Sequence, residues 1–529
     1  MSEVLLLPRV FNRFRYTKSL PKMALKARSS FVFIEIPDWV YRFILVYFIL
    51  FKLIKPVLLI LLNVSVEGVF VFTVLGIIYS LLLYAPILFF RNQVGFFHPL
   101  VFPLLFSILK GLIESRGIGL FTGFIDTDFV FSTSSAFRGQ FILSIENLHI
   151  QSSLFDIAGI VSFYIGYLAL GNTFKVNFNI PAVSLTRIPL QPLTIAKWAT
   201  VLSLGLVLVF FVSQGGLTNY LSSWGTSRKE ATEQFGIVIS ILNRAYVFPL
   251  LWFIAYRGSL RNDPLLIATI ALSLLVGYFT SGSRSSIVTS LFPFFMAWIV
   301  IHRRIPLTGP LLAGIGFFLI FGVLGKLRAS VFDGEVDWDV LTDVSIESTI
   351  QSSATEATVW ANLNADLAIY RNVPEYTPFM YGEPYLGAVF FFIPRAIWPE
   401  KPHGTGYYVG RRIFGRSQAG VPPGEVGDVY YNFGVIGIFI MFFLKGIFYR
   451  VLVNRVSRQG LADDVFFFIA YLMFLQSFSL TVLAIVQYIQ FFFFIVLVKS
   501  LIGRIDLTKM VYPMFNQAGQ ATEKKSLAT

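Results

Sequence analysis

The sequence predicts an all-α polytopic integral membrane protein with about twelve transmembrane helices. Three observations support this fold class: 56% of the 529 residues are hydrophobic, only 13% are charged, and the mean hydropathy is +0.71. Soluble domains are about 25% charged, so this composition excludes an ordinary soluble protein. The 58 phenylalanines agree with this class, because bulky apolar side chains that face lipid need no shielding from water.

The excess of positive charge indicates a membrane, and not nucleic acid, as the partner. The formal net charge is +13, and in membrane proteins lysines and arginines gather in cytoplasmic loops and beside anionic headgroups. The chain has no cysteine, which excludes disulfides and thiolate metal sites. We therefore expect contact with membrane lipid and no nucleic-acid partner.

Residues 1–40 are predicted to form a basic arm in the cytoplasm or on the membrane surface. Residues 1–30 carry seven Lys or Arg residues and a single acid, Glu3. They lack the compact apolar core and the small-residue cleavage site of a signal peptide. We therefore expect the arm to be retained.

Apolar segments separated by shorter polar loops fill residues 41–325 and 430–500. The nine spans predicted in the first region are Ile44–Val64, Val69–Phe90, Pro99–Ile113, Leu154–Leu170, Ile195–Val212, Ile237–Tyr256, Pro264–Phe279, Ile287–Ile301 and Leu307–Gly325. The three predicted in the second are Tyr431–Leu452, Val465–Ala484 and Val486–Val498. Lys52 and Lys55 fall on one face of the first span, so part of it could instead lie along the interface. Residues 501–529 are predicted to be a cytoplasmic tail.

The distribution of positive charge predicts cytoplasmic N- and C-termini. In this orientation every strongly basic short loop lies in the cytoplasm, as the positive-inside rule requires; Arg91 and Arg303 are examples. Two features then fall on the opposite, extracytoplasmic face. One is the turn Ser281–Ser286, which contains Arg284, and the other is a large loop over residues 326–429.

The large extracytoplasmic loop is the only predicted non-membrane segment big enough to form a site. Its first half is acidic, whereas the stretch from Tyr381 to Gly434 is rich in Arg, Tyr, Gly and Pro. The apolar run Tyr385–Ile393 is too short to cross a bilayer, so we expect a re-entrant or interfacial segment there. Pro394 would end this segment and leave Arg395 at the membrane surface.

The basic residues of this face run against the positive-inside tendency and should have a local function. An Arg guanidinium stays charged and pairs bidentately with phosphate oxygens, so we expect a pyrophosphate at the membrane surface. Arg284 and Arg395 are the principal candidates to bind it. Additional clamps are expected from Lys401, Arg411 and Arg412. In the alternative interpretation the loop cations only fold the loop, by pairing with Glu383, Glu400, Glu425 and Asp428.

Three segments together resemble a known family. The turn SGSRSS, followed by PRAIWPEKPHG and GEVGDVYYNFGVIGIF in a large loop, resembles the Wzy-type polymerases of O-antigen and exopolysaccharide repeat units, over roughly residues 260–455. The resemblance implies an integral-membrane glycosyltransferase of the GT-C superfamily in the bacterial inner membrane. It also implies a donor linked to undecaprenyl pyrophosphate, a lipid-linked acceptor, no cofactor, and a co-polymerase that regulates chain length.

The resemblance further implies that a hydroxyl of one lipid-linked repeat unit attacks the anomeric carbon of another, with polyprenyl pyrophosphate as leaving group. Arg284 and Arg395 would stabilise this leaving group, and loss of one such donor typically costs about 2.7–4 kcal/mol in the transition state. His403 and Glu425 are the candidate bases. The glycan is expected to contact Trp398, Tyr408, Tyr430, Tyr431 and Asp428, although an aromatic belt at the interface would explain the rings equally well. No pair of aspartates has metal-ligand spacing, so we expect no metal.

Two other functions are open at this level. O-antigen ligases similarly combine Arg and His in one large extracytoplasmic loop and transfer a glycan to a different lipid. A flippase or other transporter of lipid-linked sugars would place ionisable residues inside its spans and show internal repeats. The spans after residue 150 contain few charges, chiefly Arg244 and Lys445, and show no repeat, which favours an enzyme with its site at one face.

Overall fold

The structure is a computed structural model, and it describes only part of the chain. The described residues are 31–32, 35–54, 57–58, 61, 69–102, 104–105, 108, 142–171, 180–181, 190–213, 215–216, 244–255, 264–281, 285–302, 358–393, 395, 397–415, 420–459, 465–477 and 479–502.

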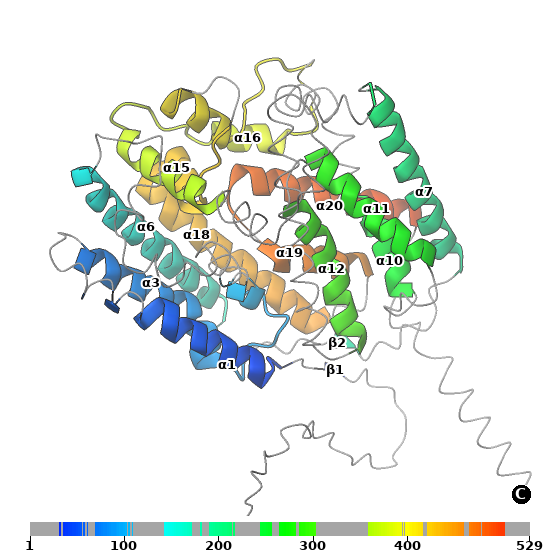
Figure 1. The fold of residues 1–529 in the computed structure, drawn as a ribbon, viewed down its shortest axis with the longest axis horizontal. Helices are drawn as coiled ribbons and strands as arrows, with labels where there is room; N and C mark the ends of the chain where they lie inside the picture. Colours follow the sequence, from blue (N-terminus) through cyan, green and yellow to red (C-terminus); the bar gives the residue numbers. More distant parts are fainter. Residues whose placement is uncertain are drawn as a thin grey trace, which may run out of the picture.

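The described part of the chain is mostly helical (Figure 1). Its α-helices are α1 (Asp38–Tyr47), α3 (Val69–Phe90), α6 (Ile142–Ala169), α7 (Leu190–Ser213), α10 (Val247–Ala255), α11 (Pro264–Ser281), α12 (Ser285–His302), α15 (Thr358–Asn372), α16 (Glu383–Val389), α17 (Thr405–Tyr408), α18 (Glu425–Gln459), α19 (Val465–Ser477) and α20 (Val482–Ile502). Single π-helical segments, Phe48–Ile54 and Val409–Ile413, continue α1 and α17. Strands β1 (Phe31–Val32) and β2 (Ile180–Pro181) form a short antiparallel pair.

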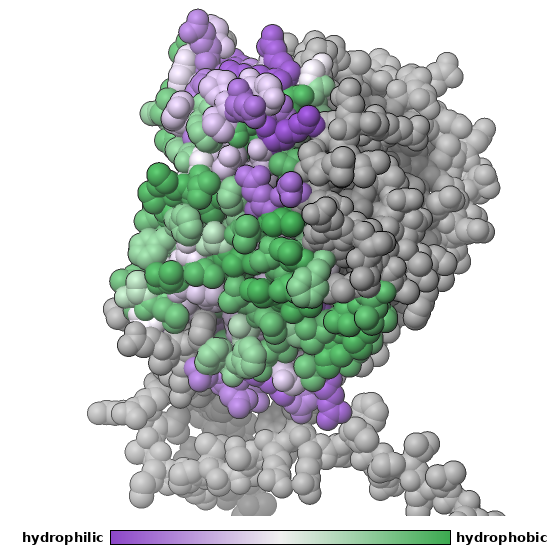
Figure 2. All heavy atoms as spheres, turned by 90° about the vertical axis from the view of Figure 1, so that its left-hand side faces the viewer, coloured by the Kyte–Doolittle hydropathy of each residue, from purple (hydrophilic) through white to green (hydrophobic). Residues whose placement is uncertain are grey.

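The surface of the molecule is that of a membrane protein. Four helices in the described ranges are long and apolar enough to cross a bilayer, namely Phe70–Phe90, Ile150–Ala169, Glu425–Val456 and Val482–Ser500. One face carries an apolar band between two hydrophilic ends (Figure 2). Large apolar side chains are exposed on these helices, for example Phe70 at 64%, Phe89 at 69% and Ile165 at 58%, and lipid is the solvent in which this exposure is favourable.

The polar ends of the molecule hold different elements. Helices α15 and α16 lie at one end, and the β1–β2 pair lies at the opposite end (Figure 1). Arg91, which directly follows α3, donates to the Asp38 carboxylate at the start of α1. Near this junction Val40 and Ile44 of α1 are buried in the same apolar cluster as Tyr84 and Ile87 of α3. In the first predicted span, Ile44–Val64, the structure shows the end of α1 and its π-helical extension, which ends at Ile54.

Helices α6 and α18 pack unusually closely because glycines line their contact. A Cβ atom added at Gly166 would overlap the Phe443 carbonyl oxygen, and one added at Gly446 would overlap the Phe163 carbonyl oxygen. Small residues allow this backbone approach between membrane helices. The two helices run parallel, since Gly159 contacts Phe442 while the later Gly166 contacts Phe443.

Most predicted spans coincide with helices where the chain is described. Helix α3 has the same bounds as the predicted span, and α6, α7, α11, α12 and α20 cover all or nearly all of theirs. The predicted span Leu307–Gly325 lies outside the described residues. The spans Pro99–Ile113 and Ile237–Tyr256 are described only in part. A total of about twelve spans therefore stays a prediction.

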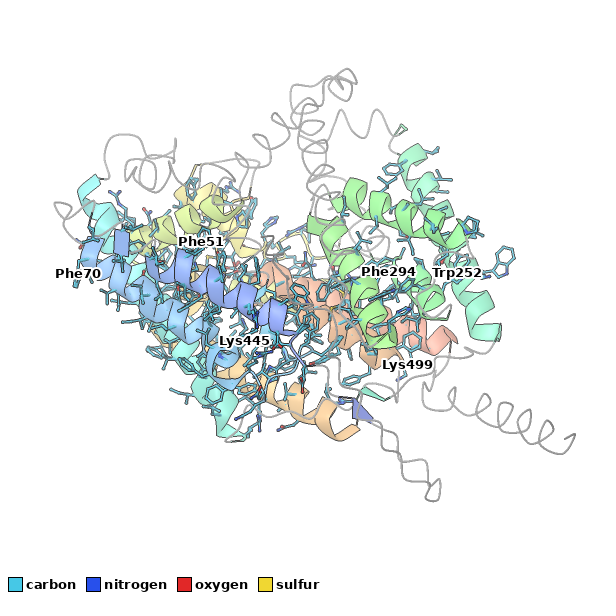
Figure 3. The ribbon with its side chains drawn as sticks, turned by 60° about the horizontal axis from the view of Figure 1, so that its bottom comes forward. Phe51, Phe70, Trp252, Phe294, Lys445 and Lys499 are labelled. Carbon is cyan, nitrogen blue, oxygen red and sulfur yellow. The ribbon has the colours of Figure 1, made fainter. Side chains whose placement is uncertain are left out.

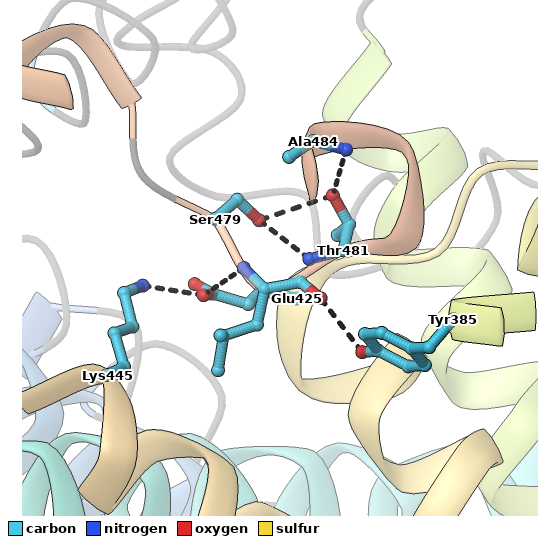
Figure 4. Close-up of polar contacts among 7 residues, drawn as sticks. Tyr385, Glu425, Lys445, Ser479, Thr481 and Ala484 are labelled. Carbon is cyan, nitrogen blue, oxygen red and sulfur yellow. Dashed lines mark hydrogen bonds and ion pairs between the residues drawn. The ribbon is translucent and has the colours of Figure 1, made fainter. Parts of the chain in front are cut away.

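Two predicted span boundaries are wrong. The predicted span Tyr431–Leu452 begins before Gly434, where the backbone is not helical. The segment Val465–Ala484 does not form one helix, because α19 ends at Ser477 and α20 begins at Val482. The Ser479 hydroxyl accepts a hydrogen bond from the Thr481 backbone N–H at 3.3 Å, and Thr481 Oγ1 accepts one from the Ala484 N–H at 3.3 Å (Figure 4). Such local bonds from Ser and Thr compete with a continuous helix, and the second is the N-cap of α20.

Candidate functional site

Helix α18 is a hairpin and not a straight rod. Gly434 has φ +66° and ψ −162°, a conformation that essentially only glycine adopts. The Lys445 ammonium lies 2.6 Å from the Glu425 carboxylate, yet the twenty positions that separate them would span about 30 Å of straight α-helix. The chain therefore folds back at Gly434, so that residues 425–433 form a short helix beside the longer helix of residues 435–459.

Aromatic contacts along α6 agree with this fold-back. The Tyr430 ring stacks on Phe155 with centroids 5.1 Å apart. Phe442, on the other arm of the hairpin, contacts Gly159 one turn further along α6. Both arms thus contact neighbouring turns of one helix, and the start of α18 lies beside the apolar helix α6.

Glu425 joins the hairpin to the break between α19 and α20 (Figure 4). Its Oε1 accepts hydrogen bonds from Lys445 Nζ at 2.6 Å and from the Leu480 backbone N–H at 2.7 Å. The Leu480 carbonyl oxygen accepts a bond from the Tyr385 hydroxyl at 2.8 Å. Lys445 lies among the helices, whereas Phe70 lies at the outer edge of the bundle (Figure 3). Glu425, a candidate base from the sequence, thus belongs to an ion pair inside the bundle.

Asp428 is buried and fully engaged. Its side chain is 2% exposed. Its Oδ1 accepts bonds from the Thr405 hydroxyl at 2.7 Å and from Asn432 Nδ2 at 3.0 Å, and its Oδ2 accepts the Val482 N–H at 3.0 Å. The predicted contact of Asp428 with sugar hydroxyls does not fit this burial.

Asp366 is a site residue that sequence reasoning missed. Its Oδ1 accepts the Gly424 N–H at 2.7 Å, at the point where α18 begins. A Cβ atom at Gly424 or Gly427 would overlap the Asp366 carboxylate, so the GEVG motif makes room for it. A carboxylate at a helix N-terminus is stabilised by the free N–H groups and the helix dipole. The spacing of the two glycines was the available signal, since glycine marks a close approach of neighbouring atoms.

The segment from Arg395 to Ile413 is named the cationic loop here. Arg395 organises the loop from within. Its guanidinium donates to the carbonyl oxygens of Lys401 at 2.6 Å, Pro399 at 3.4 Å and Pro402 at 3.5 Å, and to His403 Nδ1 at 2.9 Å. These contacts occupy the donors that were predicted to bind pyrophosphate.

Lys401 also holds the loop together. Its ammonium donates to the carbonyl oxygens of Phe391 at 2.8 Å and Ile393 at 3.1 Å, in the turns that follow α16. Partial burial and then the charge of Arg395 lower the pKa of Lys401. Arg395 and Lys401 therefore bond to backbone carbonyls, and not to the carboxylates of the alternative interpretation.

His403 lies between the loop backbone and an aromatic ring. Its imidazole stacks on Tyr407 with centroids 3.9 Å apart. Because Nδ1 accepts a bond from Arg395, a neutral His403 carries its proton on Nε2. This tautomer is a donor at Nε2, which does not suit the predicted role as base.

Arg411 and Arg412 are the exposed cations of the loop. Both belong to the π-helical turn after α17 and both are exposed. Arg411 donates to the Tyr407 hydroxyl at 2.8 Å, and Arg412 lies over the Tyr408 ring at 4.8 Å. In the described chain neither of them forms an ion pair with Glu383, Glu400, Glu425 or Asp428.

Tyr408 connects these cations to an exposed carboxylate. Its hydroxyl donates to Glu383 Oε1 at 3.3 Å and accepts the His403 backbone N–H at 3.3 Å. Burial is the main cause that raises the pKa of Tyr408, and the nearby Glu383 raises it further. The hydroxyl therefore stays protonated at neutral pH. Tyr408 contacts both Glu383 and the Arg412 guanidinium and so connects them.

The remaining predicted site residues are placed as follows. Trp398 packs edge-on against Phe390 with centroids 6.2 Å apart. Tyr430 is 6% exposed and Tyr431 is 0% exposed, so both are core residues with no ring face for a sugar. Arg284 lies outside the described residues, as does any contact it makes with Arg395. No three His, Asp or Glu side chains within the described ranges gather closely enough to hold a metal ion.

Comparison with known proteins gives one match. A family model described as a domain of unknown function (DUF8712) matches residues 208–500, which is more than half of the 529-residue chain. No curated protein and no solved structure matches the chain. The matched region contains the cationic loop, the α18 hairpin and the break before α20, but not α3 or α6. The chain therefore belongs to the DUF8712 family.

Proposed function

We propose that the protein is a membrane glycosyltransferase that polymerises oligosaccharide repeat units carried on undecaprenyl pyrophosphate. The observation that carries this proposal is the pair of exposed guanidinium groups, Arg411 and Arg412, on one turn at a polar end of the bundle. Two adjacent Arg side chains can bind the oxygens of a pyrophosphate bidentately. Tyr407 and Tyr408 directly precede this turn and offer rings beside the anion.

The proposed reaction places the leaving group on these two arginines. A hydroxyl of the acceptor glycan attacks the anomeric carbon of the donor, the bond from that carbon to the pyrophosphate oxygen breaks, and a glycosidic bond forms. Arg411 and Arg412 neutralise the charge that develops on the departing polyprenyl pyrophosphate. The exposed Glu383 accepts a bond from Tyr408, whose ring lies under Arg412, and we assign Glu383 as acceptor of the hydroxyl proton.

The other predicted residues have supporting roles in this proposal. Arg395 and Lys401 hold the loop in shape, and His403 orients Tyr407 by stacking. Arg284 is kept as a further pyrophosphate ligand. Glu425 and Asp428 serve the fold around the loop and do not touch the substrate.

The proposed location is the extracytoplasmic face of the bacterial inner membrane, on a GT-C-like scaffold of about twelve spans. The positive-inside rule supports this orientation. Arg91 follows the last residue of α3, and Arg450 of α18 lies beside the end of α6, so both lie away from the cationic loop. Arg450 lies over the Tyr167 ring near the end of α6. The lipid-linked donor and acceptor would enter from the outer leaflet, and a chain-length-regulating co-polymerase is a proposed partner.

Reconstitution with a defined lipid-linked repeat unit tests the proposal. We expect the wild-type protein to lengthen the glycan, and the Arg411→Ala/Arg412→Ala variant to lose this activity. The matched control is Arg42→Ala, which removes an exposed arginine from α1 and should retain activity. Transfer to a different lipid would instead support a ligase, and an intact repeat unit moved across the bilayer would contradict both enzymes.

A transporter of lipid-linked sugars is the second candidate. The observation that favours it is the Glu425–Lys445 ion pair inside the bundle, beside a hairpin and a broken helix. Charged groups at membrane depth and interrupted helices are typical of transport pathways. The translocation measurement in the same vesicles distinguishes this candidate from the glycosyltransferase.

A further inference from the structure

Asp428 connects three segments that are far apart in the sequence. Its carboxylate accepts bonds from Thr405 at the start of α17, from Asn432 within the short arm of α18, and from the Val482 N–H at the start of α20. Asn432 Nδ2 also donates to the Asp428 carbonyl oxygen at 2.8 Å. All these groups are buried, with Asp428 at 2%, Asn432 at 0% and Thr405 at 1% exposure.

Thr405 is the point at which this buried junction reaches the cationic loop. It begins α17, and the helical turns continue without interruption through the π-helical turn that holds Arg411 and Arg412. A continuous helical segment transmits the position of its first residue to its last. The Thr405–Asp428 bond is therefore one of the contacts that fix where both arginines lie.

The same helical segment is also held by the Val421 N–H, which donates to the Gly406 carbonyl oxygen at 2.8 Å, and by the buried Val409. Two of its other side-chain contacts are longer or more exposed. Tyr408 donates to Glu383 at 3.3 Å in an exposed contact, and Arg412 donates to the Met380 sulfur at 3.1 Å. The Thr405 bond is shorter, at 2.7 Å, and joins a hydroxyl to a buried carboxylate.

We propose that Asp428 is a positioning residue that acts through Thr405 and sets where the Arg411–Arg412 pair lies relative to the membrane. The carboxylate touches no substrate. It ties the loop to the N-terminal ends of two helices that are embedded in the bundle. This inference rests on the proposed function for its effect on rate, but its effect on loop position is independent of that function.

Thr405→Val and Thr405→Ser form a matched pair for the test. Valine keeps the shape of threonine but has no hydroxyl to donate, whereas serine keeps the hydroxyl. The cysteine-free chain permits a single nitroxide label at Arg411→Cys, whose depth in liposomes is measured from its accessibility to oxygen and to a water-soluble nickel chelate. A label at Arg42→Cys is the control that should not move.

We expect Thr405→Val to change the depth of the label at position 411 and Thr405→Ser to leave it unchanged. In the unlabelled protein Thr405→Val should lower kcat on the order of 10- to 100-fold, since small misplacements of a catalytic group have effects of this size, and serine should restore it. If Thr405→Val does not insert, Thr405→Ala replaces it, because alanine removes the hydroxyl without adding a group.

The outcomes separate this inference from the proposed function. An unchanged label depth in the valine or alanine variant overturns the positioning role, whatever happens to activity. A changed label depth with Thr405→Val, together with a wild-type protein that never lengthens glycan, supports the positioning role and contradicts the polymerase. Equal rates for the valine and serine variants overturn the link between loop position and turnover.

Discussion

The Lys445 ammonium lies 2.6 Å from the Glu425 carboxylate although the two residues are twenty positions apart in what is nominally one helix. This distance is possible only because the chain folds back at Gly434. The ion pair closes the open side of the resulting hairpin, and the Leu480 N–H on the same carboxylate oxygen joins the hairpin to the break before α20.

Removal of only one partner of this ion pair should lower the free energy of unfolding. The side chains of Lys445 and Glu425 are 11% and 24% exposed, and removal of one partner from a buried pair typically destabilises a protein by about 3–5 kcal/mol. We expect Lys445→Met to lower the free energy of unfolding by this amount, measured by denaturant titration in mixed micelles. The double variant with Glu425→Gln should lose less, because no buried charge is left unpaired.

Asp38→Asn is the control for this experiment. It removes the partner of Arg91 in an ion pair whose acid is 77% exposed, so the unfolding midpoint should hardly change. A loss with Lys445→Met no larger than with Asp38→Asn would contradict the hairpin geometry.

Gly434 should not tolerate a side chain. Its φ of +66° and ψ of −162° are strained for any L-residue, at a cost of about 1–3 kcal/mol. Gly434→Ala should therefore lower the unfolding midpoint. Gly205→Ala in α7, where an added Cβ meets nothing within 4 Å, should leave it unchanged or raise it slightly. Equal midpoints for the two variants would show that α18 does not turn at Gly434.

The GEVG motif and Asp366 should be coupled. A Cβ at Gly427 would overlap the Asp366 carboxylate, and overpacking of this kind typically costs about 1–3 kcal/mol. We expect Gly427→Ala to be destabilising and to become less so when combined with Asp366→Ala, as a double-mutant cycle would measure. Gly404→Ala, which has open space around it, is the neutral comparison. Strict additivity of the first two substitutions would exclude their contact.

His98 should make the protein sensitive to acid. It is 0% exposed and bonds to the Tyr167 hydroxyl at 2.9 Å, while its Nδ1 accepts the Leu100 N–H at 3.1 Å. Burial, and then the charge of Arg450, lower the pKa of His98 to about 3. The folded state therefore binds the proton more weakly than the unfolded state, whose pKa is about 6.5.

The contribution of His98 to stability is complete above pH ~6.5 and is lost as the pH falls toward 3. Between pH 7.5 and pH 5 this single residue should remove about 2 kcal/mol of unfolding free energy. His98→Asn, which keeps an acceptor for the Leu100 N–H, should be less stable at pH 7.5 but have a flatter pH profile. Parallel profiles for the two proteins would contradict the assignment.

Much of the helical framework follows from the sequence. Inside a bilayer a helix satisfies all of its own backbone hydrogen bonds, so long apolar runs of sequence predict helices. Helix α3 begins and ends at the predicted residues. The short apolar run at Tyr385 was also recognised as unable to span, and it forms α16 and the turns after it. The cationic character of the loop could be read from its composition.

The candidate site could be predicted only in part. Arg395 and Lys401 were recognised as unusual cations, but their bonds to backbone carbonyls depend on how the loop folds and have no sequence signature. Tyr430 and Tyr431 look like surface aromatics in a polar stretch, and they are buried because the hairpin turns them into the bundle. Thr405 and Asp366 were missed because their partners lie 23 and 58 residues away.

The sequence by itself determined that this is a helical membrane protein with a cationic, aromatic loop beside its spans, because hydropathy and charge act locally along the chain. Only the tertiary structure decided that α18 folds back at Gly434, that Glu425 pairs with Lys445, and that Asp428 holds Thr405. Those features arise from contacts between residues distant in the chain, and each depends on backbone geometry that hydropathy does not encode.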